Sequence, residues 1–217
     1  MRKLENNVDK MYTYLKGFFT GAGYIESLMA LQYARDKHTG QTRRDGITPY
    51  IIHPLQMACY AVALGIRDDY TLSIILLHDV CEDCNVKVEE LPFSREVQDG
   101  VQYMTLVYAD GEEKIVAKRR YFRNLLKNKR ALVVKAIDKY MNLKTMVGCF
   151  TEAQIIKNVK EADEFLNILS EGKKIYPDLS DIIYVLRDNI RSVNEILASD
   201  YHVYAETCKA GVMDQRG

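Results

Sequence analysis

Apolar residues recur at helical spacing along almost the whole chain, and this periodicity is what most constrains its fold. The stretch 25–34 places apolar residues three or four positions apart, as one face of a helix requires. A β-branched run follows Leu132 but continues without a break into the stretch 138–143, so we interpret it as a buried helix. We therefore expect an all-α fold. One further helix should have Pro54 in its first turn, Asp69 should cap the next, and others should cover the stretches 97–107, 114–128, 132–143, 152–170 and 179–198.

Loops and turns separate these expected helices. The stretch 39–48 contains Gly40 and Gly46 and is typical of a loop, and 108–113 contains an Asp-Gly turn. Gly172 and Pro177 are expected to separate the last two helices. No repeat, low-complexity tract or shift in composition marks a second domain. We expect one domain over residues 1–217, with its motifs within 25–150, further helices within 151–200 and a frayed tail after Tyr201.

The charge balance excludes a general attraction to anionic polymers. The chain carries 30 basic and 30 acidic residues, so we expect no binding to nucleic acid or to an anionic membrane surface. The first residues are charged throughout and do not resemble a signal peptide. The longest apolar run, 74–77, stops at His78 and is far too short to span a bilayer. These features predict a cytoplasmic protein.

The five cysteines show no disulfide framework. Their number is odd, and only Cys81 and Cys84 form a C-x-x-C pattern, with two acidic residues between them. Reduced thiols are the favoured interpretation and a redox pair is the alternative.

A cluster of ionisable residues closes an apolar helix. His78-Asp79 ends the helix and Glu82-Asp83 follows, so spacing of four would place His78 above Glu82 and Asp79 above Asp83. Three acidic residues lie within five positions, and no Lys or Arg lies among them. This favours a divalent metal ion as the compensating charge. A solvated helix end is the alternative, but the helix dipole disfavours acidic residues there.

Two more residues are candidates for the same ion. His53 precedes Pro54 after an apolar run, and Asp138 lies in an apolar helical segment. A single His in such a place is more often a hydrogen-bonded core residue. With His78-Asp79 available, we favour a ligand.

Four motifs in order resemble a known family. They are His38-Thr39-Gly40-Gln41-x-Arg43, Thr48-Pro49-Tyr50-Ile51-Ile52-His53-Pro54, Leu76-Leu77-His78-Asp79-Val80-Cys81-Glu82-Asp83 and Asp138-Lys139-x-x-Asn142-Leu143. A bare His-Asp pair is weak evidence, but this order and spacing is specific. The chain resembles the HD-domain hydrolases, in particular the hydrolase domain of the RelA/SpoT alarmone enzymes and their small stand-alone Mesh1-like forms.

The resemblance implies a helical bundle around one divalent metal ion, usually Mn²⁺, with Fe²⁺, Co²⁺ or Zn²⁺ as other possibilities. By matching motifs, the metal ligands would be His53, His78, Asp79 and Asp138. Glu82 and Asp83 match the acidic pair that positions or deprotonates the attacking water. The family reaction removes pyrophosphate from the ribose 3′ position of ppGpp or pppGpp. Because no synthetase half is evident, we expect hydrolysis without synthesis.

The resemblance also implies contacts with a small nucleotide substrate, and it assigns them to Arg43, Arg44, Arg119, Tyr121, Lys139 and Asn142. His38 is expected to order the loop after it, and His202 to have no role. Cys81, Cys84, Asp45 and Met141 depart from the family pattern. These departures leave open a phosphohydrolase of another nucleotide, such as a nucleoside monophosphate, a cyclic nucleotide or NADPH. A non-enzymatic binding module is less favoured, because Glu82-Asp83 is intact.

Overall fold

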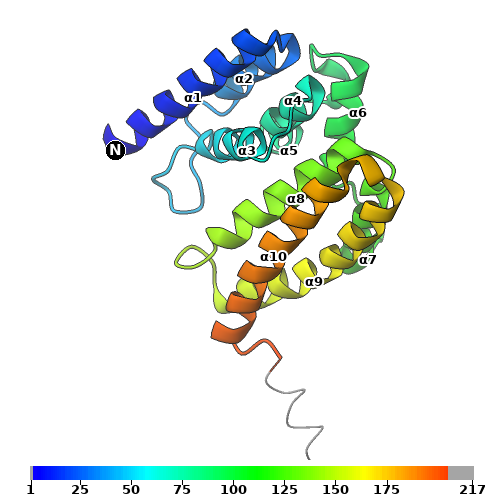
Figure 1. The fold of residues 1–217 in the computed structure, drawn as a ribbon. Coiled ribbons are helices and arrows are strands. Elements are labelled where there is room, and N and C mark those ends of the chain that lie inside the picture. Colours follow the sequence, from blue (N-terminus) through cyan, green and yellow to red (C-terminus); the bar gives the residue numbers. More distant parts are fainter. Residues whose placement is uncertain (1, 205–217) are drawn as a thin grey trace, which may run out of the picture. The chain divides into compact units, whose positions relative to one another are not determined.

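A computed structural model describes residues 2–204, with side chains from residue 7 onward, and every regular element in this part of the chain is helical. The predicted all-α fold is therefore confirmed (Figure 1). The chain forms two compact units, Met1–Asp138 and Lys139–Gly217. The first unit contains α1 (Arg2–Ala22), α2 (Ile25–Lys37), α3 (Ile52–Ala63), α4 (Asp69–Leu77), α5 (Val80–Asp83), η1 (Val88–Glu90), α6 (Arg95–Met104), α7 (Lys114–Leu125) and most of α8 (Lys129–Lys144). The second contains the end of α8, α9 (Glu152–Ile175), η2 (Pro177–Leu179) and α10 (Ser180–Asp200).

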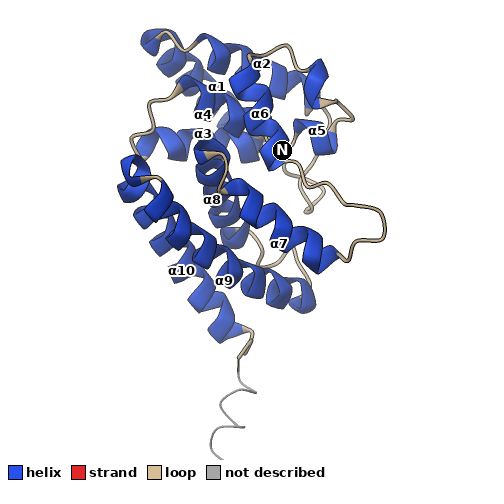
Figure 2. Ribbon diagram, turned by 90° about the vertical axis from the view of Figure 1, so that its right-hand side faces the viewer, coloured by secondary structure: helices blue, strands red, loops and turns tan. Residues whose placement is uncertain are grey.

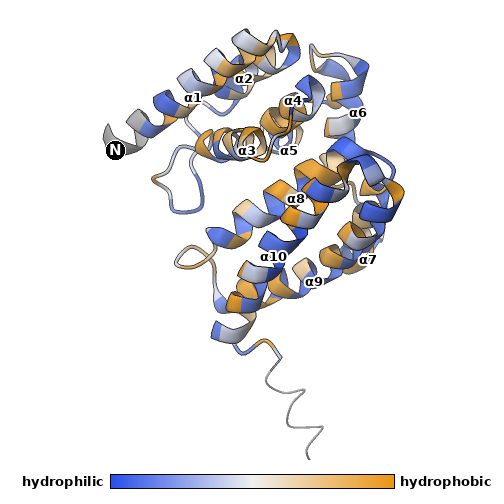
Figure 3. Ribbon diagram, in the orientation of Figure 1, coloured by the Kyte–Doolittle hydropathy of each residue, from blue (hydrophilic) through white to orange (hydrophobic). Residues whose placement is uncertain are grey.

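Helix α4 lies at the centre of the first unit. Every residue from Thr71 to Leu77 is buried, as is expected of a helix that is apolar on all sides. It packs against α2, α3 and α6, and the apolar colouring of α3 and α4 is evident in Figure 3. Gly100 of α6 lies so close to Ile74 that a Cβ atom there would be 2.1 Å from Ile74 Cδ1. Burial of α4 along its whole length brings its last residues into the interior.

The start of α4 differs by one residue from the prediction. Asp68 is the cap, and its Oδ2 accepts hydrogen bonds from the Thr71 backbone N–H at 3.1 Å and from the Thr71 hydroxyl at 2.6 Å. Asp69 is instead the first helical residue. Its carboxylate accepts hydrogen bonds from the backbone N–H groups of Glu26 and Ser27, at 3.1 and 2.8 Å. The two adjacent aspartates therefore accept hydrogen bonds from backbone N–H groups in the first turns of two different helices, Asp68 in α4 and Asp69 in α2.

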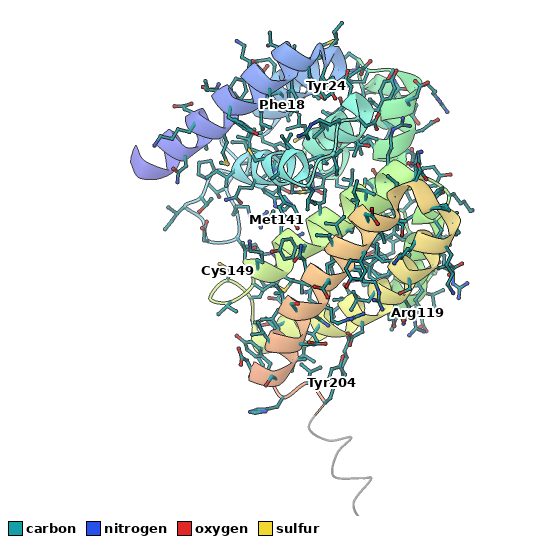
Figure 4. All side chains as sticks on the ribbon, in the orientation of Figure 1. Phe18, Tyr24, Arg119, Met141, Cys149 and Tyr204 are labelled. Carbon is teal, nitrogen blue, oxygen red and sulfur yellow. The ribbon has the colours of Figure 1, made fainter. Side chains whose placement is uncertain are left out.

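Helix α1 was not predicted as a separate element. Its buried residues Val8, Leu15 and Phe19 recur at helical spacing, and it packs against α2 and α3. At the turn into α2, the rings of Phe18 and Tyr24 meet edge to face, 6.1 Å apart (Figure 4).

The second unit is built on an antiparallel pair formed by α9 and α10, which can be traced in Figure 2. The predicted break at Gly172 is wrong, because α9 continues through this buried glycine to Ile175. Pro177 is what ends the helix, since a residue before proline is disfavoured in the helical region, and Tyr176 adopts φ −121° and ψ 76°. The apolar faces bury Phe165, Leu169, Ile183, Leu186 and Ile190.

Three further observations bear on the sequence predictions. None of the described helices combines the length and apolarity that crossing a membrane would require. The four cysteines that the structure describes are free thiols. His202 is exposed in a turn after α10. Residues 205–217 of the predicted tail, which include Cys208, lie outside the described residues.

Candidate metal centre

Three buried side chains from different helices converge in the first unit. His53 lies in the first turn of α3, His78 caps the C-terminal end of α4, and Asp138 lies in α8. Each has an exposed fraction of 4% or less. Their ligand atoms all lie within 4.8 Å of one another, although the residues are separated by up to 85 positions in the chain.

The His78 ring is oriented so that its Nε2 atom faces the carboxylates of Asp79 and Asp138. Its Nδ1 lies 2.7 Å from the carbonyl oxygen of Ile75, so Nδ1 carries a proton and donates it, and Nε2 is the nitrogen that offers a lone pair when the ring is neutral. Nε2 lies 2.8 Å from Asp79 Oδ2 and 3.9 Å from Asp138 Oδ1, yet it is buried without a properly oriented hydrogen-bond partner. His53 Nε2 lies 3.1 Å from the same Asp138 oxygen. Imidazole nitrogens and carboxylate oxygens that converge in this way fit a divalent cation.

The acidic groups dominate the electrostatics of the cluster. Burial alone would lower the pKa of His78, but the negative charge of Asp79, the contact with its carboxylate and the charge of Asp138 together raise it to about 9. Burial would raise the pKa of the Asp79 carboxyl, and His78 outweighs that effect and lowers it. The pKa of His53 is lowered, chiefly by burial. The protein thus surrounds His78 with negative charge that a cation would balance.

One predicted helix face does not exist. Helix α4 ends at Leu77, the chain turns at His78 and Asp79, and α5 begins at Val80. Asp79 and Asp83 are still in contact through their backbones, because the Asp83 N–H donates a hydrogen bond to the Asp79 carbonyl at 2.8 Å. The expected stacking of His78 on Glu82 along one continuous helix is wrong, because the turn interrupts the helix between them.

The carboxylates of Glu82 and Asp83 lie at the protein surface in α5. Glu82 Oε1 accepts a hydrogen bond from the Leu106 backbone N–H at 2.7 Å. The pKa values of both groups are raised, first by partial desolvation and also by the charge of Asp79. A carboxylate with a raised pKa is a better proton acceptor near neutral pH.

The loop before α3 is held by His38. Its Nδ1 lies 2.7 Å from Gln41 Oε1, and its ring lies against the ring of Tyr50, tilted by 34° with centroids 4.6 Å apart. The Tyr50 hydroxyl in turn donates to Asp79 Oδ2, and the Arg43 guanidinium lies 5.8 Å from the centre of the Tyr50 ring. The loop therefore connects His38 and Arg43 to the cluster through one tyrosine.

The structure places the remaining predicted contact residues in different surroundings. Arg44 is exposed in the same loop, and Arg119 is exposed on α7 (Figure 4). Tyr121 is buried, and its hydroxyl donates to the Met104 carbonyl at 2.9 Å. In the second unit, Asn142 is half-buried, and the Lys139 ammonium lies 3.6 Å from Glu161 Oε2. Substrate contact by these residues stays a prediction.

Two residues at the cluster were not predicted as site residues. Tyr50 lies within the Thr48-Pro49-Tyr50-Ile51-Ile52-His53-Pro54 motif, and its position three residues before His53 was the available signal. Lys135 places its Nζ 2.7 Å from Asp138 Oδ2. It precedes Asp138 by three positions, so both lie on one face of α8.

Known proteins are similar to this chain in sequence and fold. No protein-family model matches the chain. The guanosine-3′,5′-bis(diphosphate) 3′-pyrophosphohydrolase MESH1 of Xenopus tropicalis is 32% identical over 154 residues, which cover 67% of this chain and 83% of that protein. The chain belongs to the family of guanosine-3′,5′-bis(diphosphate) 3′-pyrophosphohydrolases. The predicted resemblance to this family is confirmed.

Two bacterial relatives and one solved structure are also similar to this chain. A pyrophosphohydrolase of the same description from Vibrio cholerae is 37% identical over 123 residues, or 52% of this chain. That match spans only 17% of the bacterial protein, and one from Spiroplasma citri spans 16%. A solved structure of a metazoan orthologue of SpoT that hydrolyses ppGpp has a TM-score of 0.61 at 24% identity, covering 82% of this chain and 97% of that chain. This likeness supports the fold of the pyrophosphohydrolase family.

Proposed function

We propose that the chain hydrolyses guanosine 3′,5′-bis(diphosphate), releasing pyrophosphate from the ribose 3′ position. The observation that carries this proposal is the convergence of His53, His78 and Asp138 in a chain of the pyrophosphohydrolase family. The substrate is a small nucleotide, and the chain acts as a metal-dependent phosphoric ester hydrolase in the cytoplasm, within the stringent response.

The buried cluster is the proposed site of one divalent ion, with Mn²⁺ as the proposed metal. His53 and His78 would offer their Nε2 atoms and Asp138 its Oδ1 atom. Asp79 is the proposed fourth ligand, because its Oδ2 lies 2.8 Å from His78 Nε2. A mixed set of imidazoles and carboxylates suits Mn²⁺ and similar ions better than a structural zinc. When bound, such an ion supplies Lewis acidity, which lowers the pKa of water and polarises a phosphoryl oxygen.

The chain's own residues would then move the protons. Glu82 and Asp83 are the proposed acceptors of the proton from the attacking water, since their raised pKa values favour proton uptake. Tyr50 holds Asp79 through its hydroxyl, which limits rotation of that carboxylate. Arg43 and Arg44 lie in the loop that leads to Tyr50, and they are the proposed partners of the nucleotide's negative charges.

The test is a hydrolysis panel with the purified full chain and Mn²⁺. We expect ppGpp to be converted to GDP and pppGpp to GTP, each with one equivalent of pyrophosphate. Release of orthophosphate from ppGpp, or no turnover by metal-loaded protein, would refute the substrate assignment.

A second nucleotide class is tested by the same panel. Cys81 and Cys84, which depart from the family pattern, flank the acidic pair, so the base and phosphate preference of this chain can differ from that of its relatives. Nucleoside monophosphates, cyclic nucleotides and NADPH are the substrates to compare. Faster turnover of any of these than of ppGpp would favour the alternative function.

A further inference from the structure

The two oxygens of the Asp138 carboxylate face different groups. Oδ1 lies 3.1 Å from His53 Nε2 and 3.9 Å from His78 Nε2, so it faces the two histidines of the candidate metal site. Oδ2 lies 2.7 Å from the ammonium group of Lys135, which donates a charge-assisted hydrogen bond to it. One oxygen is thus directed at the histidines while the other is occupied by a cation from the protein.

Lys135 is itself held in place. Its side chain is only 20% exposed, and its ammonium lies 5.6 Å from the centre of the Tyr121 ring. The Tyr121 hydroxyl donates to the Met104 carbonyl at the end of α6, which fixes the ring against which the ammonium packs. A lysine with an aromatic face on one side and a carboxylate on the other has little freedom to leave either.

We propose that Lys135 is a positioning residue, which occupies Asp138 Oδ2 so that the metal ion is bound through Oδ1 alone. This inference rests on the metal site of the proposed function but not on the identity of the nucleotide. Partners behind a ligand set its orientation, and losing one costs roughly 10- to 100-fold in affinity or activity. The same arrangement gives Tyr121 a supporting role behind Lys135.

Removal of the ammonium should change how Asp138 binds the ion. In Lys135→Met, Oδ2 loses this cationic partner, so the carboxylate can rotate or bind the ion through two oxygens. Either change alters the coordination number or geometry of the ion. Lys135→Arg keeps a positive charge and N–H donors, and we expect it to preserve single-oxygen binding.

The test uses Co²⁺ as the probe, because its visible absorption spectrum reports coordination geometry independently of turnover. The full chain is loaded with saturating Co²⁺, and the bound metal is measured. We expect wild type and Lys135→Met each to bind one equivalent, with an altered spectrum and a roughly 10- to 100-fold lower kcat in the variant. Lys135→Arg and the control Lys129→Met, an exposed lysine at the start of the same helix, should retain the wild-type spectrum.

The outcomes separate this inference from the proposed function. A Lys135→Met spectrum that superimposes on that of wild type would overturn the positioning role, even if activity falls. Failure of wild type to bind Co²⁺ would refute the metal site and, with it, the inference. If Lys135→Met does not fold, Lys135→Gln removes the ammonium while keeping a polar side chain, and the same spectral criterion applies to it.

Discussion

The two nitrogens of the His78 ring have different partners, and this difference defines the residue-scale chemistry. Nδ1 is fixed by the Ile75 carbonyl of its own helix, while Nε2 faces the carboxylates of Asp79 and Asp138. A buried nitrogen that faces acidic oxygens without a hydrogen bond is costly unless a cation lies between them. A divalent metal ion bound at this potential site would remove that cost.

The acidic pair provides the sharpest residue-scale prediction. Glu82→Gln combined with Asp83→Asn should keep one equivalent of bound Mn²⁺ and lose at least about 100-fold in kcat, because an amide cannot accept the proton from water. Metal content and ppGpp turnover are measured on the same preparation. Glu89→Gln with Glu90→Gln changes two exposed carboxylates nearby and should have no effect. An active Glu82–Asp83 double variant would show that this pair does not take the proton.

At the element scale, the position of the cluster depends on how α4 is packed and capped. The residues of α4 from Thr71 onward are buried, and so is His78, which follows the helix directly. Any shift of the helix along its axis would therefore move His78. The contact with α6 at Gly100 and the cap at Asp68 restrain that shift from the side and from the N-terminal end.

The contact with α6 leaves no room for a side chain. Gly100→Ala would place a Cβ 2.1 Å from Ile74 Cδ1 and 2.6 Å from Ile74 Cγ1, and Ile74 is fully buried and cannot move freely. We expect the variant to lose about 1–3 kcal/mol of unfolding free energy, measured by urea denaturation. Gly17→Ala, in a helix with open space around the new Cβ, should instead be neutral or stabilising by up to about 1 kcal/mol. Equal effects at both glycines would contradict the packing argument.

The cap of α4 predicts a dependence of stability on pH. Asp68 is partly buried, which raises the pKa of its carboxyl, but hydrogen bonds from Arg130 and Thr71 prevail and lower it. A lowered pKa means that the ionised form stabilises the folded state, so this contribution is present above about pH 4 and is lost as the pH falls further. Asp68→Ala should therefore cost about 1 kcal/mol at pH 7, and progressively less in acid.

Urea denaturation at several pH values measures this difference directly. The exposed Asp110→Ala should have the same stability as wild type at each pH. A stability loss at Asp68 that stays constant down to pH 2 would mean that the charge of its carboxylate is not what stabilises α4.

At the scale of the whole molecule, the cluster joins segments that are distant in sequence. His53 and Asp138 lie in α3 and α8, and His78 directly follows α4, all within the first unit. An ion bound to all three would therefore oppose unfolding of that unit. An ion that binds only the folded state stabilises it by about 2.7 kcal/mol when its free concentration is roughly 100 times the Kd.

Mn²⁺ should accordingly raise the melting temperature of the chain by roughly 5–10 °C at that excess, and a chelator should reverse the shift. The measurement is differential scanning fluorimetry across a Mn²⁺ titration. His78→Gln should abolish the metal-dependent shift, whereas His202→Gln, which changes an exposed residue after α10, should leave it intact. A full shift in His78→Gln would place the stabilising ion elsewhere.

Much of the architecture could be predicted from the spacing of residues alone. Helical periodicity identified most of the helices, since the burial of one face is encoded locally. The exceptions have physical causes: Gly172 is tolerated inside α9, and the chain turns at His78 and Asp79 where a continuous helix was expected. Propensity and spacing cannot show where tertiary contacts override a local preference.

The sequence by itself determined the family, the all-α class and the residues with the chemistry to bind a metal, because motif order and helical spacing are properties of the linear chain. Only the tertiary structure decided which of those residues meet. It turned Lys135 toward Asp138 and Lys139 toward Glu161, although both lysines flank the same aspartate. The reason is geometric: side chains three positions apart on a helix share a face, whereas adjacent ones point about 100° apart.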